Sequence, residues 1–129
     1  QRDSTTHYDI MSEVISSLKR SISLAIEAGV AEPNIIVDPG IGFGKSVEQN
    51  LAIIRRLAEL KVLGRPILLG TSRKFVTSQA PDQRLEATSA TVAIGIAHGA
   101  DMVRVHDVRQ MVLVCRMSDA IIRRRQGGD

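Results

Sequence analysis

Short apolar runs and longer helical segments alternate along this chain, and this alternation constrains its fold more than any other feature. Three runs predict strands buried on both faces, because they are rich in aliphatic residues; they cover 34–38, 66–70 and 102–106. Four segments repeat apolar residues at helical spacing, over 10–28, 46–63, 82–98 and 107–124. The alternation predicts an α/β fold whose strands are parallel and joined by right-handed helical crossovers.

Residues at the segment ends support these boundaries. Gly29, Gly64 and Gly99 follow three of the predicted helices, where glycine commonly ends a helix. Ser46 with Gln49 and Asp107 with Gln110 have the spacing of capping boxes, so we expect helices to begin there.

Three parallel strands leave a sheet that the four helices cover mainly on one face. Either the chain forms a small open sheet, or it is part of a (β/α)8 barrel, which needs about 250 residues. The third strand favours the TIM barrel, since Arg104 and His106 share one face while Val103 and Val105 share the other. We therefore expect residues 1–129 to be a single partial domain with the C-terminal three strands and four helices of a barrel.

Composition narrows the class of protein. The chain has 129 residues, a net charge of +3 and only 2% aromatic residues, which argues against nucleic-acid binding. It has neither an apolar run long enough to span a membrane nor a secretory signal, so we expect a cytoplasmic protein without membrane contact. Cys115 is the single cysteine, and no set of side chains has the spacing of a protein-built metal site.

A glycine-rich segment, Asp38-Pro39-Gly40-Ile41-Gly42-Phe43-Gly44-Lys45-Ser46, follows the first predicted strand. Its glycines would let backbone N–H groups approach a ligand closely. It is not a phosphate-binding P-loop, because that motif needs a glycine where Pro39 stands, and it does not match the dinucleotide fingerprint. The alternative is a glycine-rich turn that only leads into a helix.

Two further polar clusters follow the other strands. Ser72, Arg73 and Lys74 come after the second strand and could bind an anion or a heterocycle, although such a string is also typical of a solvated loop. Arg104 lies in an otherwise apolar strand, so it needs a carboxylate or a phosphate as partner; an internal salt bridge is the structural alternative. Phe43 and Phe75, the two phenylalanines, lie in the loops at strand ends, where they could stack on a flat ring or fill gaps.

The segments Asp38-Pro39-Gly40-Ile41-Gly42-Phe43-Gly44-Lys45, Ser72-Arg73-Lys74 and Arg104-Val105-His106-Asp107, in this order and at these strand ends, resemble the C-terminal half of dihydropteroate synthase. The resemblance implies a (β/α)8 barrel that condenses dihydropterin methyl pyrophosphate with p-aminobenzoate and releases pyrophosphate. In that family the pyrophosphate leaves first and the arylamine attacks the resulting cation. The resemblance also implies that this chain alone, without the N-terminal half, is inactive.

The resemblance implies roles for particular residues. Asp38, Lys74, Arg104 and His106 would be the catalytic residues: Asp38 and Lys74 would contact the pterin, and Arg104 and His106 the pyrophosphate. Other positions would complete the substrate site: Gly70 beside the pterin, Phe43, Ser72 and Arg73 along the p-aminobenzoate channel, and Gly42.

The family also implies partners. Mg²⁺ is expected to bind through the substrate pyrophosphate and the half of the barrel that this chain does not contain. A homodimer is expected to form on the last helices, which carry Val112, Val114, Met117 and Ile121.

Two other functions remain open at this stage. One is another pterin-binding barrel, such as the methyltetrahydrofolate-binding domain of a methyltransferase. The other is a non-catalytic half-barrel that acts as a binding module.

Overall fold

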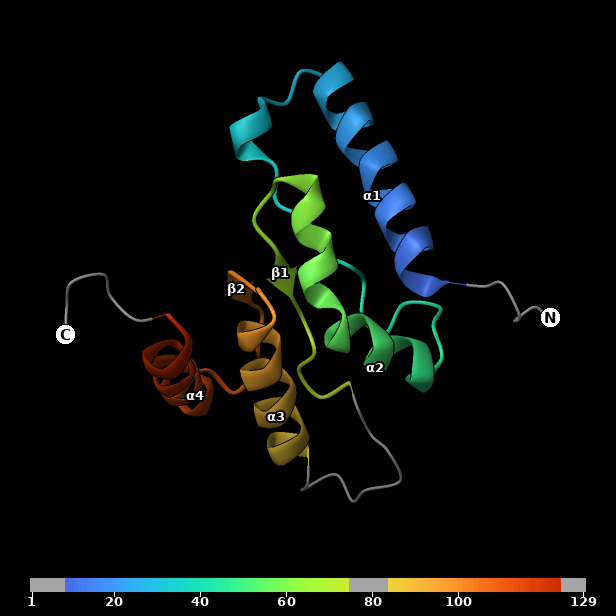
Figure 1. Cartoon of the computed structure of the whole chain (residues 1–129). Helices are drawn as coiled ribbons and strands as arrows, with labels where there is room; N and C mark the ends of the chain where they lie inside the picture. Colours follow the sequence, from blue (N-terminus) through green and yellow to red (C-terminus); the bar gives the residue numbers. More distant parts are fainter. Residues whose placement is uncertain (1–8, 75–83, 124–129) are drawn as a thin grey trace.

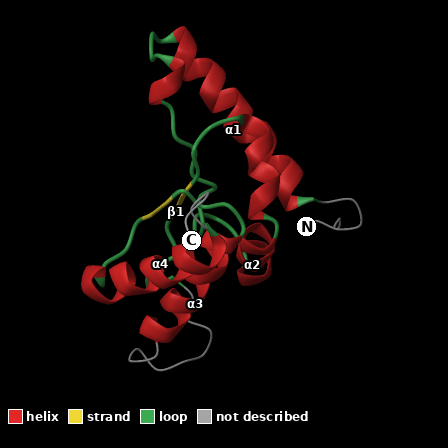
Figure 2. Cartoon of the chain, turned by 60° about the vertical axis from the view of Figure 1, so that its left-hand side comes forward, coloured by secondary structure: helices red, strands yellow, loops and turns green. Residues whose placement is uncertain are grey.

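The computed structural model describes residues 9–74 and 84–123. Along the chain lie α1 (Ile10–Glu27), η2 (Glu32–Asn34), α2 (Val47–Arg55), η3 (Leu57–Leu63), β1 (Leu68–Leu69), α3 (Arg84–Ala97), β2 (Met102–Val103) and α4 (Val108–Ile122). In Figure 1 the two strands lie in the middle, with α1 on one side and α4 on the other. Figure 2 shows how short the strands are beside the helices. Phe75 and the predicted helix ends at 82 and 124 fall outside the described residues.

The strands are parallel, as the sequence predicts. Leu68 and Leu69 pair with Met102 and Val103 in β1 and β2, and Val37 forms a parallel bridge with Ile67. The ladder is shorter than predicted. Residues 34–38 do not form a full strand, because Pro33 lies in the 3-10 turn η2 and the chain becomes extended only after it. The prediction of five-residue strands at 66–70 and 102–106 is also too long.

The two faces of the strands differ in burial. Val37, Ile67 and Leu69 are buried beneath the helices, in a core that α1, α2 and η3 share. Ile36 and Met102 are exposed, as are Arg104 and His106 farther along. Val103 and Val105 pack toward α3 and α4, so the predicted separation of these valines from Arg104 and His106 is confirmed.

Most helix ends match their sequence signals. Gly29, Gly64 and Gly99 all have positive φ, the conformation that glycine adopts most readily. Ser46 and Gln49 form the predicted capping box. The capping box predicted at Asp107 is wrong: Asp107 precedes α4 but its carboxylate caps no helical N–H, because it accepts a hydrogen bond from Arg73 instead.

The helix predicted over 46–63 is wrong in its second half. The α-helix ends at Arg55, and η3 continues as a 3-10 helix from Leu57. Leu57 and Leu60 are fully buried. Since residues three apart eclipse in a 3-10 helix, the tighter turn directs both leucines into the same core.

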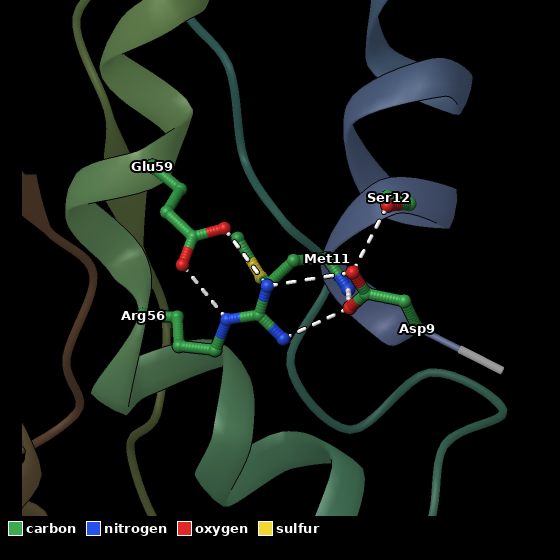
Figure 3. A network of polar contacts seen from close by, with 5 residues as sticks. All are labelled: Asp9, Met11, Ser12, Arg56 and Glu59. Carbon is green, nitrogen blue, oxygen red and sulfur yellow. Dashed lines mark hydrogen bonds and ion pairs between the residues drawn. The ribbon is translucent and has the colours of Figure 1, made fainter. Parts of the chain in front are cut away.

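A polar network joins the start of α1 to the junction between α2 and η3 (Figure 3). The Arg56 guanidinium donates to Asp9 Oδ1 at 2.8 Å and to Glu59 Oε2 at 2.8 Å. Asp9 also caps α1 by accepting from the Met11 N–H, and the contact with Arg56 lowers the pKa of Asp9. One guanidinium therefore fixes where α1 begins relative to α2.

Helices α3 and α4 pack on each other around Val92, Ile96 and Met111. Val114 packs against this cluster, whereas Val112, Met117 and Ile121 are exposed. The four residues predicted to form one dimer surface are thus divided between two faces of α4. Half-buried Cys115 also packs against the cluster, and burial raises the pKa of its thiol.

None of the helices in residues 9–74 and 84–123 has the length and apolar content needed to cross a membrane.

Close packing of α3 on β1 predicts the effect of Gly95→Ala. A Cβ at Gly95 would lie 2.3 Å from Cδ2 of the buried Leu69. Alanine is normally about 1 kcal/mol better than glycine inside a helix, but overpacking a core costs about 1–3 kcal/mol. We therefore expect Gly95→Ala to lower the free energy of unfolding, measured by urea denaturation.

The control is the reverse change, Ala90→Gly, at an exposed position of the same helix. It reports helix propensity alone and should cost about 1 kcal/mol. A gain in stability for Gly95→Ala would contradict the steric account.

Candidate active site at the carboxyl ends of the strands

The loop after Val37 is shaped by its own backbone and by two side chains. Asp38 Oδ1 accepts the Gly40 N–H at 2.8 Å, and Lys45 Nζ donates to the carbonyl oxygens of Gly40 and Phe43. Gly40 and Gly42 have φ of 79° and 88°, which L-residues rarely adopt. The prediction that glycine is needed for the backbone conformation of this loop is confirmed at Gly40 and Gly42. Phe43 is left 66% exposed on the outside of the turn.

Lys74 reaches back across this loop from the next strand end. Its Nζ donates to the Ile41 carbonyl oxygen at 2.9 Å and lies 4.8 Å from the centroid of the Phe43 ring. Gly42 makes room for it, because a Cβ there would lie 3.1 Å from Lys74 Cδ. Burial lowers the pKa of Lys74, the positive charge of Arg104 lowers it further, and the Asp38 carboxylate acts in the opposite direction.

Arg104 joins the third strand end to the first. Its Nη2 lies 3.7 Å from Asp38 Oδ2, which is longer than a tight charge-assisted hydrogen bond. Gly70 lies beside it: a Cβ on Gly70 would be 3.0 Å from Arg104 Nη2. The resemblance implies that the space left by Gly70 lies beside a pterin. In the structure the Arg104 guanidinium occupies this space. The internal salt bridge that the sequence left as an alternative is present, but its length leaves both groups able to accept other partners.

A second set of contacts joins the second and third strand ends. Ser72 Oγ lies 2.8 Å from His106 Nδ1 and also accepts the His106 backbone N–H at 3.1 Å. Next to it, Arg73 Nη2 donates to Asp107 Oδ1 at 3.2 Å. Ser72 is only 5% exposed, so its hydroxyl is directed into the protein and not into an open channel.

The predicted site residues thus form two adjoining groups. One contains Asp38, Gly42, Phe43, Gly70, Lys74 and Arg104; the other contains Ser72, Arg73 and His106. Two cavities border the first group. One of about 530 Å³ lies between α1 and the 38–45 loop and includes Asp38, while another of about 500 Å³ beside α4 includes Arg104.

In the described residues, no three His, Cys, Asp or Glu side chains lie close enough together to hold a metal ion. Asp38 is the carboxylate of the first group, and it is already engaged by Gly40 and Arg104.

Asn50 is a site residue that the sequence analysis missed. It is buried on α2, and its Oδ1 accepts the Gly42 N–H at 3.0 Å. The sequence does carry a signal: Asn50 lies three, four and seven positions before Ile53, Ile54 and Leu57, all buried, and so occupies the core-facing side of its helix. A polar residue on such a face needs a hydrogen-bond partner.

The family model described as pterin binding enzyme matches residues 1–106. A dihydropteroate synthase of Bacillus subtilis is 45% identical over 94% of this chain and 44% of its own length. One of Clostridium beijerinckii is 48% identical over 95% of this chain and 48% of its own length. The chain therefore spans about half the length of the curated relatives it matches.

Solved structures agree with the sequences. A dihydropteroate synthase of Clostridium difficile, crystallised in the presence of pteroic acid, is 50% identical with a TM-score of 0.85, over 92% of this chain and 46% of that one. A Yersinia pestis dihydropteroate synthase in complex with a sulfonamide drug is 31% identical with a TM-score of 0.84, over 89% and 43% of the two chains. The resemblance inferred from the three motifs is confirmed.

Two charged neighbours of Lys74 act on its pKa in opposite directions, so removing each of them should shift the pKa in opposite directions. Arg104→Met removes a nearby positive charge, so we expect the pKa of Lys74 to rise. Asp38→Asn removes the charge that favours the ammonium, so we expect the pKa to fall. NMR titration of the Lys74 side chain measures both. Arg73→Met, whose guanidinium pairs with Asp107, is the control and should leave the titration unchanged; shifts of the same sign in the two test variants would contradict this arrangement.

The buried Asn50 predicts a local effect on the loop. Asn50→Ala removes the acceptor of the Gly42 N–H, and an ordinary hydrogen bond contributes about 0.5–1.5 kcal/mol net to stability. We expect lower stability in urea and faster hydrogen exchange at the Gly42 amide. Gln49→Ala is the matched control, because the Gln49 side chain accepts the Ser46 N–H whereas the Gly42 N–H is bound by Asn50. Unchanged exchange at Gly42 in Asn50→Ala would refute the anchoring role.

Proposed function

The chain belongs to the pterin binding enzyme family, and from this we propose that it corresponds to the C-terminal half of a dihydropteroate synthase, with the last three strands and four helices of a (β/α)8 barrel as one partial domain. The fold supports this proposal. Parallel strands carry one face toward the helices and one open face, which is apolar at Ile36 and Met102 and charged at Arg104. In a closed barrel that open face would be the interior, and its charged end would be the mouth.

The reaction we propose is the condensation of dihydropterin methyl pyrophosphate with p-aminobenzoate. The C–O bond to the pyrophosphate breaks first and its electron pair leaves with the pyrophosphate. The arylamine nitrogen then attacks the methylene cation and loses a proton. The protein needs no nucleophile for this chemistry; it positions the two substrates and stabilises charge.

In this proposal Asp38 and Lys74 hold the pterin. Asp38 uses Oδ1 for the Gly40 N–H, while Oδ2 has only the long contact with Arg104 and can accept N–H donors from a pterin edge. Lys74 is fixed by the Ile41 carbonyl and the Phe43 ring. Both groups are therefore in place before substrate binds.

Arg104 and His106 hold the pyrophosphate. The guanidinium can grip phosphate oxygens in a bidentate manner, and its loose pairing with Asp38 leaves donors available. Positive charge here stabilises the leaving group as it departs.

Phe43, which is exposed, and Arg73 remain candidates for the p-aminobenzoate side. Ser72 needs a different role from the one the resemblance implied, because its buried hydroxyl is engaged with His106.

Partners outside this chain complete the proposal. Magnesium would be held by the substrate pyrophosphate and by residues of the N-terminal half, since the described residues offer no carboxylate cluster. A homodimer would use the outer face of α4, where Val112, Met117 and Ile121 are exposed. The cytoplasm is the proposed location, and sulfonamides are the proposed inhibitors.

The convergence of three strand ends carries the proposal. Asp38, Lys74 and Arg104 come from positions far apart in the sequence, yet they interact electrostatically at one edge of the sheet. They also lie in the three motifs on which the resemblance to dihydropteroate synthase rests.

The test uses the complete protein that contains this chain. We expect it to form dihydropteroate from both substrates with magnesium, and the 129-residue chain alone to form none. Lys74→Ala should weaken pterin binding and Arg104→Ala pyrophosphate binding, each roughly tenfold or more, because each loses charge-assisted hydrogen bonds.

Matched controls are Lys19→Ala and Arg55→Ala, exposed cations on α1 and α2 that should leave the kinetics unchanged. Normal kinetics in both Lys74→Ala and Arg104→Ala would reject this site. Methyl transfer from a folate in place of p-aminobenzoate use would reject the reaction.

A further inference from the structure

Ser72 lies where two strand ends meet. It is 5% exposed, and its hydroxyl oxygen contacts two atoms of one residue: the backbone nitrogen of His106 at 3.1 Å and the ring nitrogen Nδ1 at 2.8 Å. The hydroxyl therefore holds both the main chain and the side chain of His106.

The direction of these bonds follows from counting donors. A serine hydroxyl has one hydrogen to donate and can accept at its oxygen. The backbone N–H of His106 can only donate, so Oγ accepts there. Within the described residues, Nδ1 is the acceptor that the Ser72 hydrogen reaches. If Nδ1 carried a proton instead, Oγ would accept twice and a buried hydroxyl hydrogen would lack a partner, which costs about 1–3 kcal/mol.

We propose that Ser72 is a positioning residue that holds neutral His106 in the tautomer with Nδ1 as acceptor and the proton on Nε2. His106 is exposed, and no hydrogen bond among the described residues uses Nε2. The ring then offers an N–H donor to an anion instead of a lone pair that would repel it. The benefit for pyrophosphate rests on the proposed function, whereas the tautomer itself does not.

The turn that carries Ser72 is fixed in place by its neighbours. Arg73 has a φ of 59°, rare for a residue with a side chain, and its N–H donates to the buried Thr88 Oγ1 at 3.0 Å. The Arg73 guanidinium pairs with Asp107, the residue after His106. Thr71 Oγ1 lies 2.7 Å from Thr91 Oγ1. Bonds on both sides of Ser72 thus hold in place the backbone from which its hydroxyl projects.

His98 supplies an internal reference with the opposite tautomer. Its Nδ1 lies 2.9 Å from the Ile94 carbonyl oxygen, which can only accept, so neutral His98 carries its proton on Nδ1. One protein should therefore contain two histidines with opposite tautomers.

The first experiment is ¹⁵N NMR of the imidazole rings in the complete protein that contains this chain, at about pH 8.5, well above the ordinary pKa of an imidazole. We expect the cross-peak pattern of an unprotonated Nδ1 for His106 and of a protonated Nδ1 for His98. A protonated Nδ1 on His106, or an equal mixture of tautomers, would overturn the proposal without any variant.

Variants then test whether Ser72 is the cause. Ser72→Ala should turn the single His106 tautomer into a mixture, while Ser72→Thr, which keeps the hydroxyl, should preserve it. Ser89→Ala is the matched control, because it removes a hydroxyl that donates to the Leu85 carbonyl on α3. A single unchanged tautomer in Ser72→Ala would overturn the positioning role. Should Ser72→Ala not fold, a mixture of tautomers in Ser72→Thr, which keeps the hydroxyl, would still overturn the proposal.

Inorganic pyrophosphate separates this inference from the proposed function. Added to the complete protein, it should shift the Nε2 signal of His106, and Ser72→Ala should weaken its binding roughly fivefold, the effect of about one net hydrogen bond. The predicted tautomer without a pyrophosphate shift would reject the proposed role of His106 but keep the positioning role. A pyrophosphate shift with the proton on Nδ1 would keep the proposed role of His106 but reject the positioning role of Ser72.

Discussion

Three strand segments pair in parallel through their backbones, and this pairing determines where the loops and side chains of the site lie. The Leu68 N–H donates to the Val37 carbonyl at 2.8 Å, and the Arg104 N–H donates to the Leu69 carbonyl at 3.0 Å. Because parallel strands run in one direction, these bonds bring their carboxyl ends to one edge. The loop that each strand enters then lies beside its neighbours, and charged residues from distant parts of the sequence meet there.

The same pairing explains why each strand end carries both packing and polar residues. Side chains alternate across a strand, so the register that buries Val37 and Leu69 places Asp38 and Gly70 on the open face. Shifting one strand by a single residue would bury a charge and expose an aliphatic side chain. Core packing under the helices therefore fixes the positions of the charged groups on the other face.

Features of the fold that depend on short-range sequence patterns could be predicted, whereas features that depend on contacts between distant residues could not. The alternation of elements, the glycine helix ends and the Ser46 capping box follow from short-range rules, and the structure has them. The break at Arg56 depends on Leu57 and Leu60 entering a core built by other elements. The Asp107 carboxylate does not cap α4 because it pairs with Arg73, 34 positions away. Propensity cannot report such long-range competition, and it cannot give the length of a strand whose pairing depends on its neighbours.

The hydrogen-bond partners that hold Lys74 and His106 in the site are both uncharged groups. Lys74 is fixed by a backbone carbonyl and His106 by a buried hydroxyl, and neither bond cancels charge. Arg104 does meet a carboxylate, but at 3.7 Å, whereas the Arg73 guanidinium pairs with Asp107 at 3.2 Å. A site that neutralised all its cations internally would have to break ion pairs before it could bind an anion. In this arrangement the groups that orient Lys74 and His106 are uncharged, so they do not compete with an anionic ligand. The positive potential at the strand ends therefore stays available to that ligand.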